Sequence, residues 1–236
     1  MRNITSIIAN NTNNSEDDVY NLLKDNEYLD SLINDYWFIT NDIKNNEIYY
    51  SLEGYLYPDT YRFASKDVKV EEIFNKLIKK MDSVLTPLKE QIEKSEFTPH
   101  ELLTLASIAE MEVKNTSDYR EKVVSVFVNR LHKGMSLGSD VTTRYAIKLD
   151  DKRALKKSEY DSVNAYNTRS ETMAGKLPAG PISMPSSSSI LAVLNYPVTD
   201  YLYFIANIQT GETFFYSKYS DFEKKKQELS NINGNY

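Results

Sequence analysis

The sequence predicts an α+β protein that is built in two parts. Helical patterns fill roughly the first 50 residues, an aromatic stretch with Gly54 and Pro58 follows, and a longer helical region leads to two β-prone segments. Helices and strands that occur in separate runs, without regular alternation, are typical of the α+β class. A length of 236 residues allows one large or two small domains.

Composition excludes several kinds of site. The chain is 41% hydrophobic and 26% charged, as globular proteins are. Its formal net charge of -6 argues against nucleic acid as a partner, because phosphate binding needs a basic face. There is no cysteine, which excludes disulfides and thiolate metal sites. His100 and His132 are the only histidines, which leaves little material for a His-rich metal site or a Ser-His-Asp triad. We therefore expect no metal and no cofactor, and we expect both histidines near helix ends or exposed.

Neither a bilayer-spanning stretch of about 20 apolar residues nor a signal peptide is visible. Two interpretations remain at this point. One is a soluble cytoplasmic protein, which composition alone favours. The other is a segment of an exported protein whose export signal precedes residue 1.

Short helices are predicted over residues 1 to about 50, where apolar residues recur at helical spacing. Ser15 is expected to be the N-cap of one of them, with Asp18 at the third helical position. Residues 48–63 are aromatic and β-prone, with Gly54 and Pro58 as turn residues. We predict a strand, a turn and a second strand there.

The middle of the chain predicts helices. Apolar residues recur at helical spacing over 70–88, which predicts a long amphipathic helix that Pro87 kinks. Residues 98–101 (TPHE) form a helix start, with a capping threonine, a proline at the first position and a glutamate at the third. The helix that follows is apolar on most sides, so we expect it to be buried. Gly134 is expected to be the C-cap of the next helix.

The last third combines loops with strands. Residues 176–185 contain three prolines and cannot be helical. The serines of 186–194 are expected to cap a short helix. Residues 201–206 are predicted to form a buried strand that makes a hairpin with 213–216, and a charged helix is expected from Asp221 onward.

Glu110 is the strongest candidate for a catalytic residue. It shares one face of the buried helix with Leu103 and Ala106, so we expect a desolvated carboxylate whose raised pKa keeps it protonated near neutral pH. A general acid needs this property. The alternative is a structural glutamate that pairs with Arg120 or Arg130, because ion pairs also shift pKa values.

Glu112 is close to Glu110 in sequence, but two helical residues are ~200° apart around the axis. The two carboxylates are therefore expected to face opposite ways and not to serve as a paired acid and base. We expect Glu112 to be structural, where it caps a backbone group or holds an arginine.

Two polar segments, 139–145 and 165–169, lie between apolar helices. Their Asp, Asn, Thr and Tyr side chains are of the kinds that hydrogen-bond sugar hydroxyl and acetamido groups. Turn formation by the same residue types is the alternative. The 18 tyrosines of the chain fit stacking against sugar rings and fit core positions equally well.

Five blocks, in order, resemble signature blocks of the endolytic murein transglycosylase family, also called the YceG-like family. They are 52–61 (LEGYLYPDTY), 106–112 (ASIAEME), 126–135 (VFVNRLHKGM), 166–168 with 177–182 (YNT and LPAGPI), and 201–204 (YLYF). A single chance motif cannot match five blocks in order. By this resemblance, residues 1–66 are a LysM-like module and residues 67–236 are the catalytic domain.

The resemblance also implies a function. Glu110, the first glutamate of the ExE block, is the catalytic residue by this resemblance, and sugar-binding roles are implied for a set of polar residues: Asp140, Thr142, Tyr145, Asn167 and Thr168. The implied reaction is non-hydrolytic cleavage of the MurNAc–GlcNAc β-1,4 bond within a peptidoglycan glycan strand, which leaves 1,6-anhydromuramic acid ends. The family is anchored in the inner membrane by one N-terminal helix that this chain lacks, so the resemblance favours the extracytoplasmic interpretation. Cell-wall synthases are left open as partners.

The chain departs from the family pattern at several positions. Gly138 and Val141 stand where the family has a glutamine and a proline, Arg169 replaces a tyrosine, and Lys176 replaces a glycine. These departures are expected to affect how the substrate fits. Glu110, the proposed acid, is present. Two other classes of function stay open, a non-catalytic peptidoglycan-binding module and a scaffold of the cell-wall machinery.

Overall fold

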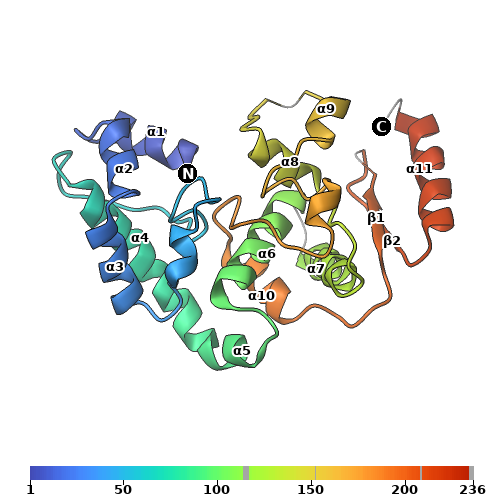
Figure 1. The fold of residues 1–236 in the computed structure, drawn as a ribbon, viewed down its shortest axis with the longest axis horizontal. Coiled ribbons are helices and arrows are strands. Elements are labelled where there is room, and N and C mark those ends of the chain that lie inside the picture. Colours follow the sequence, from blue (N-terminus) through green and yellow to red (C-terminus); the bar gives the residue numbers. More distant parts are fainter. Residues whose placement is uncertain (114–116, 152, 208, 234–236) are drawn as a thin grey trace.

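The computed structural model describes residues 1–113, 117–151, 153–207 and 209–233. It is rich in helices and contains one small antiparallel sheet, which confirms the α+β class. Helices α1–α4 gather at one end of the molecule, α6–α10 form its middle, and the hairpin with α11 lies at the other end (Figure 1).

The N-terminal part consists of short helices, as predicted. They are α1 (Arg2–Asn11), α2 (Glu16–Leu22), α3 (Asn26–Asp35) and the 3-10 helix η1 (Asn41–Lys44). Ser15 caps α2, and it exchanges hydrogen bonds with Asp18 in a capping box, which confirms that helix start. Helix α4 (Val70–Leu85) packs against α2, so the first helices and α4 share one core.

The prediction of two strands over residues 48–63 is wrong. The segment is a series of tight turns, with local hydrogen bonds such as Tyr55 N to Leu52 O at 3.1 Å. Leu52, Tyr55 and Leu56 are fully buried, so the aromatic and aliphatic residues fill the core and do not line a sheet. Propensity alone misleads here because strand residues need a pairing strand.

The central helices follow the predicted boundaries closely. Helix α4 ends at Leu85, and a 3-10 turn, η2 (Thr86–Leu88), with Pro87 inside it leads to α5 (Lys89–Lys94). Helix α6 (Pro99–Glu112) begins with the predicted capping box, and its residues 102–109 are all buried. Helices α7 (Ser117–His132) and α10 (Ser187–Leu194) pack against it. Gly134 adopts a φ of +65° just after α7, as a C-cap glycine does.

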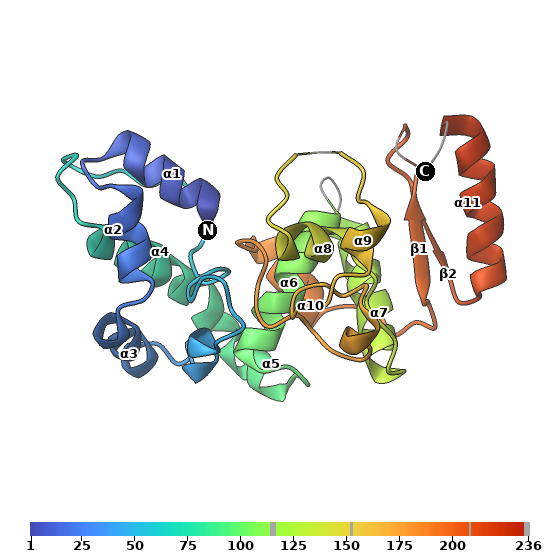
Figure 2. The ribbon, with the colours of Figure 1, turned by 45° about the horizontal axis from the view of Figure 1, so that its top comes forward.

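The remaining elements are short. They are α8 (Asp140–Ala146), α9 (Lys157–Tyr160), the 3-10 helix η3 (Glu171–Met173), β1 (Tyr203–Ala206), β2 (Thr213–Tyr216) and α11 (Tyr219–Asn233). The hairpin is confirmed, with Tyr203 opposite Tyr216. Figure 2 shows that α11 runs beside the hairpin. The prediction of a buried first strand is wrong, because its residues are only partly buried and Ala206 is exposed.

One continuous hydrophobic core extends from Val19 through Tyr55 to Ile190. It therefore joins the N-terminal helices to the central ones. Among the residues that the structure describes, none of the helices is long and apolar enough to cross a membrane.

Candidate functional site

Helix α6 carries Glu110 and Glu112 in its last turn, and the two carboxylates contact different elements. Glu110 Oε2 accepts hydrogen bonds from Ser186 N at 3.0 Å, Ser186 Oγ at 2.6 Å and Ser189 Oγ at 2.6 Å. These donors belong to the N-terminal end of α10. Arg120 Nη2 lies 4.0 Å from Glu110 Oε1, so the alternative of an arginine partner is confirmed.

The pKa of Glu110 is shifted in the direction opposite to our prediction. Burial acts to raise the pKa of this carboxyl. The hydrogen bonds from Ser186 and Ser189 and the charge of Arg120 outweigh burial and hold the pKa below its ordinary value. The prediction of a raised pKa, which rested on apolar helix neighbours, is therefore wrong. Glu110 has the environment of an ionised residue that caps α10.

Glu112 has the raised pKa. Ser139 Oγ donates a hydrogen bond to Glu112 Oε1 at 2.6 Å. Burial is the largest cause of the raised pKa, and the negative charge of Asp140 adds to it. The Ser139 hydrogen bond and the charges of Arg169 and Arg130 oppose the shift without cancelling it. The pKa values of the two glutamates are thus shifted in opposite directions.

Three of the predicted sugar-binding residues are buried inside the scaffold next to Glu112. Thr142, Asn167 and Thr168 have no exposed surface. Asn167 Nδ2 donates to Tyr160 O at 2.9 Å and to Ser162 O at 2.6 Å, so it closes the loop between α9 and η3. A direct sugar contact stays a prediction for these three residues, and their burial argues against it.

Asp140 and Arg169 form an ion pair at the surface beside Glu112. Their side chains are 47% and 40% exposed, so Asp140 is the predicted sugar-binding residue that remains accessible. The Arg169 guanidinium also lies over the Tyr160 ring, 5.0 Å from its centroid. Arg169 stands where the family has a tyrosine. It thus places a positive charge next to the carboxylates of Asp140 and Glu112.

Tyr145 connects α8 to the turn segment that precedes α4. Its hydroxyl donates to Glu53 Oε2 at 3.3 Å, and its ring centroid lies 5.7 Å from that of Tyr49 and 4.8 Å from that of Tyr166. The half-buried ring is therefore committed to an aromatic cluster, and its predicted role in sugar binding stays a prediction.

Two of the sequence blocks pack directly against each other. Gly54 has a φ of +84°, and a Cβ at this position would lie 2.3 Å from Pro181 Cβ. His100 Nε2 lies 3.0 Å from Ala179 O and its Nδ1 lies 2.7 Å from Tyr55 Oη, so the ring connects both blocks. His100 lies at the start of α6, as predicted, but its ring is buried, so the expectation of an exposed histidine is wrong. The sequence signal for this contact is the glycine and proline content of the two blocks, 52–61 and 177–182.

The other sequence blocks hold loops in place. Asn129 Nδ2 donates to the carbonyls of Thr199 and Tyr201, both at 2.9 Å, and Arg130 Nε donates to Leu202 O at 2.7 Å. Residues 129–130 therefore fix the segment that enters β1. Sequence reasoning missed this role, since no local pattern indicates which distant carbonyls an amide will bind.

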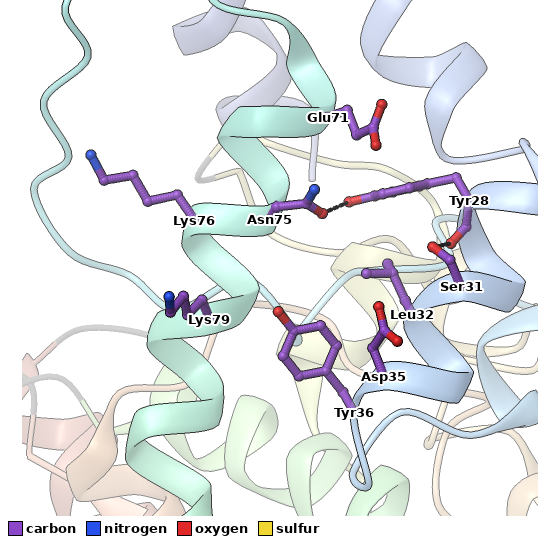
Figure 3. Close-up of a pocket in the computed structure, with 9 residues that line it drawn as sticks. All are labelled: Tyr28, Ser31, Leu32, Asp35, Tyr36, Glu71, Asn75, Lys76 and Lys79. Atoms are coloured by element: carbon purple, nitrogen blue, oxygen red, sulfur yellow. Dashed lines mark hydrogen bonds between the residues drawn. The ribbon is translucent and has the colours of Figure 1, made fainter.

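Two cavities among the described residues lie away from both glutamates. One of about 420 Å³ lies between α3 and α4, where Tyr28 Oη donates to Asn75 Oδ1 at 2.9 Å (Figure 3). Another of about 810 Å³ is lined by α1, residues 57–63 and α4, with Met184 beside them. Neither is lined by residues of the polar segments around Glu112.

Comparison with known proteins identifies the family. The family model of the YceG-like family matches residues 1–228. An endolytic murein transglycosylase of Bacillus subtilis (strain 168) is 37% identical over 97% of this chain and 62% of its own length. One from Streptococcus pneumoniae (strain D39) is 31% identical over 80% of this chain and 34% of its own length.

A solved structure agrees. The crystal structure of a yceG-like protein of Listeria monocytogenes superposes with a TM-score of 0.85 at 35% identity, covering 93% of this chain and 70% of that one. The chain spans about 62% of the Bacillus relative's length and a smaller share of the Streptococcus one. The chain belongs to the YceG-like family.

Proposed function

We propose that this protein is an endolytic peptidoglycan lytic transglycosylase. It cleaves the MurNAc–GlcNAc β-1,4 bond inside glycan strands and leaves 1,6-anhydromuramic acid ends. Two kinds of observation support the proposal: the relatives that match carry the name endolytic murein transglycosylase, and the ExE block with its two carboxyl groups forms the last turn of a buried helix.

We propose Glu110 as the acid, because it is the first glutamate of the ExE block that the chain shares with its family. Its carboxylate lies at the end of α6, where it accepts three hydrogen bonds from the N-terminal end of α10 and faces Arg120. Glu112 in the same helix turn has a raised pKa and lies beside the accessible Asp140, so it is the competing candidate. A general acid must give up a proton during the reaction, so replacing each glutamate by glutamine decides between them.

One carboxyl group suffices for this reaction. The protonated acid donates its proton to the glycosidic oxygen as the bond from that oxygen to C1 breaks. The resulting carboxylate then removes the proton from the C6 hydroxyl, and O6 forms a new bond to C1. No water is consumed, so the carboxyl group returns to its protonated form. Glycosidases that use water or a covalent intermediate need two carboxylates.

Asp140 is an accessible carboxylate that could supply the second carboxyl group of a hydrolase. Its ion pair with Arg169 commits it to an arginine, which favours a role in binding over activation of water. The products distinguish the two reactions, because an anhydro end is lighter than a reducing end by one water.

The test is digestion of purified peptidoglycan followed by mass analysis. We expect anhydro products from the wild-type protein, mid-length fragments early in the digestion, and loss of activity by about 100-fold or more in Glu110→Gln. Glu112→Gln is the matched variant on the same helix. Activity lost in Glu112→Gln but kept in Glu110→Gln would move the acid to Glu112. Reducing ends as the main product would overturn the lyase mechanism, and early release of disaccharides would overturn internal cutting.

The family resemblance supports three further parts of the proposal. Residues 1–66 act as a LysM-like glycan-binding module before a catalytic region of residues 67–236, although 1–66 is helical and contains no strand in this fully described range. The protein works outside the cytoplasm, anchored by a preceding membrane helix, and cell-wall synthases stay open as its partners. Cell fractionation and co-purification with a synthase test the last two. A non-catalytic binding module or scaffold would bind peptidoglycan and release no products.

A further inference from the structure

A groove lies where the N-terminal helices meet the loop that precedes α10. Its volume is about 810 Å³, and its lining comes from α1, residues 57–63, α4 and Met184. Ile7 of α1 lines this groove and is 60% exposed, although isoleucine is usually buried. The groove therefore presents an apolar side chain that the described part of the chain leaves uncovered.

Three aromatic rings from one short segment line the same groove. Tyr57, Tyr61 and Phe63 are each partly buried, so each ring keeps some exposed surface. Tyr61 Oη donates to Tyr57 O at 2.8 Å, and Lys76 Nζ lies 4.7 Å from the centroid of the Phe63 ring. These contacts hold the rings in place before a ligand arrives, which lowers the entropy lost on binding. Fixed, partly exposed aromatic rings suit stacking against the apolar faces of sugar rings.

Amide groups of α1 also line the groove. Asn3 and Asn11 are both exposed there. Asn11 Nδ2 donates to Ile7 O at 2.8 Å, which leaves Oδ1 as an acceptor, and the Asn3 amide has no hydrogen-bond partner among the residues that the structure describes. Amides donate to and accept from hydroxyl and acetamido groups. The groove thus combines apolar with polar groups, as an amino sugar does, whereas a lipid chain or the apolar face of a helix offers the amides no partner.

The groove borders the segment that binds Glu110. Met184 lines the groove, and Ser186, two residues later, donates its N–H at 3.0 Å and its hydroxyl at 2.6 Å to Glu110 Oε2. This segment is fixed on α6, because Ser183 Oγ donates to Ser107 O at 3.0 Å. Two residues of chain span about 7 Å, so Met184 lies on the order of 10 Å from the Glu110 carboxylate. A polymer can therefore occupy the groove and reach Glu110 at the same time.

We propose that this groove is a remote subsite for the glycan strand, which holds sugar units at a distance from the bond that is cut. Its ligand is a β-1,4-linked strand of N-acetylated amino sugars. This inference rests on the proposed function, with Glu110 as the acid. A strand held both in the groove and at Glu110 extends beyond the cut bond on the groove side, so the cut falls inside the strand and not at its end.

Binding in the groove is measured directly with a fluorescent probe. The chain has no cysteine, so Ile7→Cys creates a single site for a thiol-reactive dye that responds to its surroundings. Val198→Cys is the matched control, because Val198 is 99% exposed and does not line the groove. Both are combined with Glu110→Gln, which removes the proposed acid. Soluble, uncrosslinked glycan strands should shift the emission of the dye at position 7 and leave that of the dye at position 198 unchanged.

Removal of one aromatic ring tests the effect of the groove on cutting. We expect Tyr61→Ala to weaken the binding of long strands by about 10-fold and to raise KM on them by the same factor, with little change in kcat. Tyr61→Phe loses the hydroxyl but keeps the ring, so it should bind long strands as the wild type does. The rise in KM should grow with strand length, because only longer strands span the groove and Glu110 together.

The outcomes separate this inference from the proposed function. A wild-type protein that forms no anhydro products would refute the function, whether or not the dye responds. If anhydro products form, a dye at position 7 that does not respond to strands would overturn the subsite. Emission that shifts with protein concentration alone would assign the groove to a second copy of the chain and would also overturn it.

The Tyr61 variants give an independent result. Wild-type KM on long strands in Tyr61→Ala, or an equal rise in KM on short and long strands, would contradict a remote subsite. Ile7 is exposed, so the labelled Ile7→Cys protein decides the question even if Tyr61→Ala fails to fold.

Discussion

Glu110 and Glu112 stand one residue apart on α6, yet their carboxylates are held by segments on different sides of that helix. Ser186 and Ser189 of the α10 end bind Glu110, whereas Ser139 at the start of α8 binds Glu112. The pKa of Glu110 is lowered and that of Glu112 is raised. One helix turn therefore carries two carboxyl groups whose pKa values are shifted in opposite directions by different neighbours.

Glu110 should stabilise the fold in its ionised form. Its pKa is lower in the folded than in the unfolded protein, so the contribution is full above the unfolded pKa and is lost as pH falls through the folded one. Glu110→Ala removes the acceptor for Ser186 and Ser189 and should cost about 1–3 kcal/mol at pH 7. Thermal unfolding from pH 7 to pH 3 measures this. Glu47→Gln, at an exposed glutamate, is the control, and a deficit that does not shrink toward acid would contradict the prediction.

Glu112 should destabilise the fold in its ionised form, in contrast to Glu110. Its pKa is raised in the folded state, so the folded protein binds more protons than the unfolded one and loses stability as pH rises from the unfolded toward the folded pKa. Glu112→Gln removes this penalty. Its melting temperature should exceed that of the wild type more at pH 8 than at pH 4. Equal differences at the two pH values would show that the folded-state pKa is not raised.

Arg169 should tune the pKa of Glu112. Its positive charge lowers that pKa, so Arg169→Tyr, which introduces the residue of the family pattern, should raise it further. The folded protein should then lose more stability than the wild type as pH rises from 4 to 8, and Glu112→Gln should remove the difference. Thermal unfolding across this range measures it, and an unchanged pH dependence would contradict the prediction. Arg62→Gln changes net charge by one unit at an exposed position and should leave the pH dependence in place.

Gly54 should tolerate no side chain. Alanine there would adopt an unfavourable positive φ and bring Cβ within 2.3 Å of Pro181 Cβ. Gly134→Ala is a matched control, since its φ of +65° imposes similar backbone strain while nothing lies within 4 Å of the added Cβ. We expect Gly54→Ala to cost about 1–3 kcal/mol more than Gly134→Ala. Denaturant unfolding of the two variants measures the difference in their free energies of unfolding. Equal losses of stability would mean that Pro181 moves aside at little cost in free energy.

Helix starts and ends followed from the sequence because their signals are local. Residues 15–18 and 98–101 contain both halves of a capping box within four positions, and both helices begin there. The hairpin over 203–216 was also predicted correctly. The stretch 48–63 was not, because its aromatic residues have strand propensity, but the surrounding core buries them in turns.

The sequence by itself determined the helix boundaries, the buried character of α6, the opposite directions of Glu110 and Glu112, and the family of the chain. The tertiary structure alone decided the direction in which the pKa of each carboxyl group is shifted. Periodicity places a side chain on a helix face, but it does not state what lies against that face. The donors to Glu110 are 76 and 79 residues away in the chain, and the donor to Glu112 is 27 residues away. A pKa depends on such partners, so it is set only when the chain has folded.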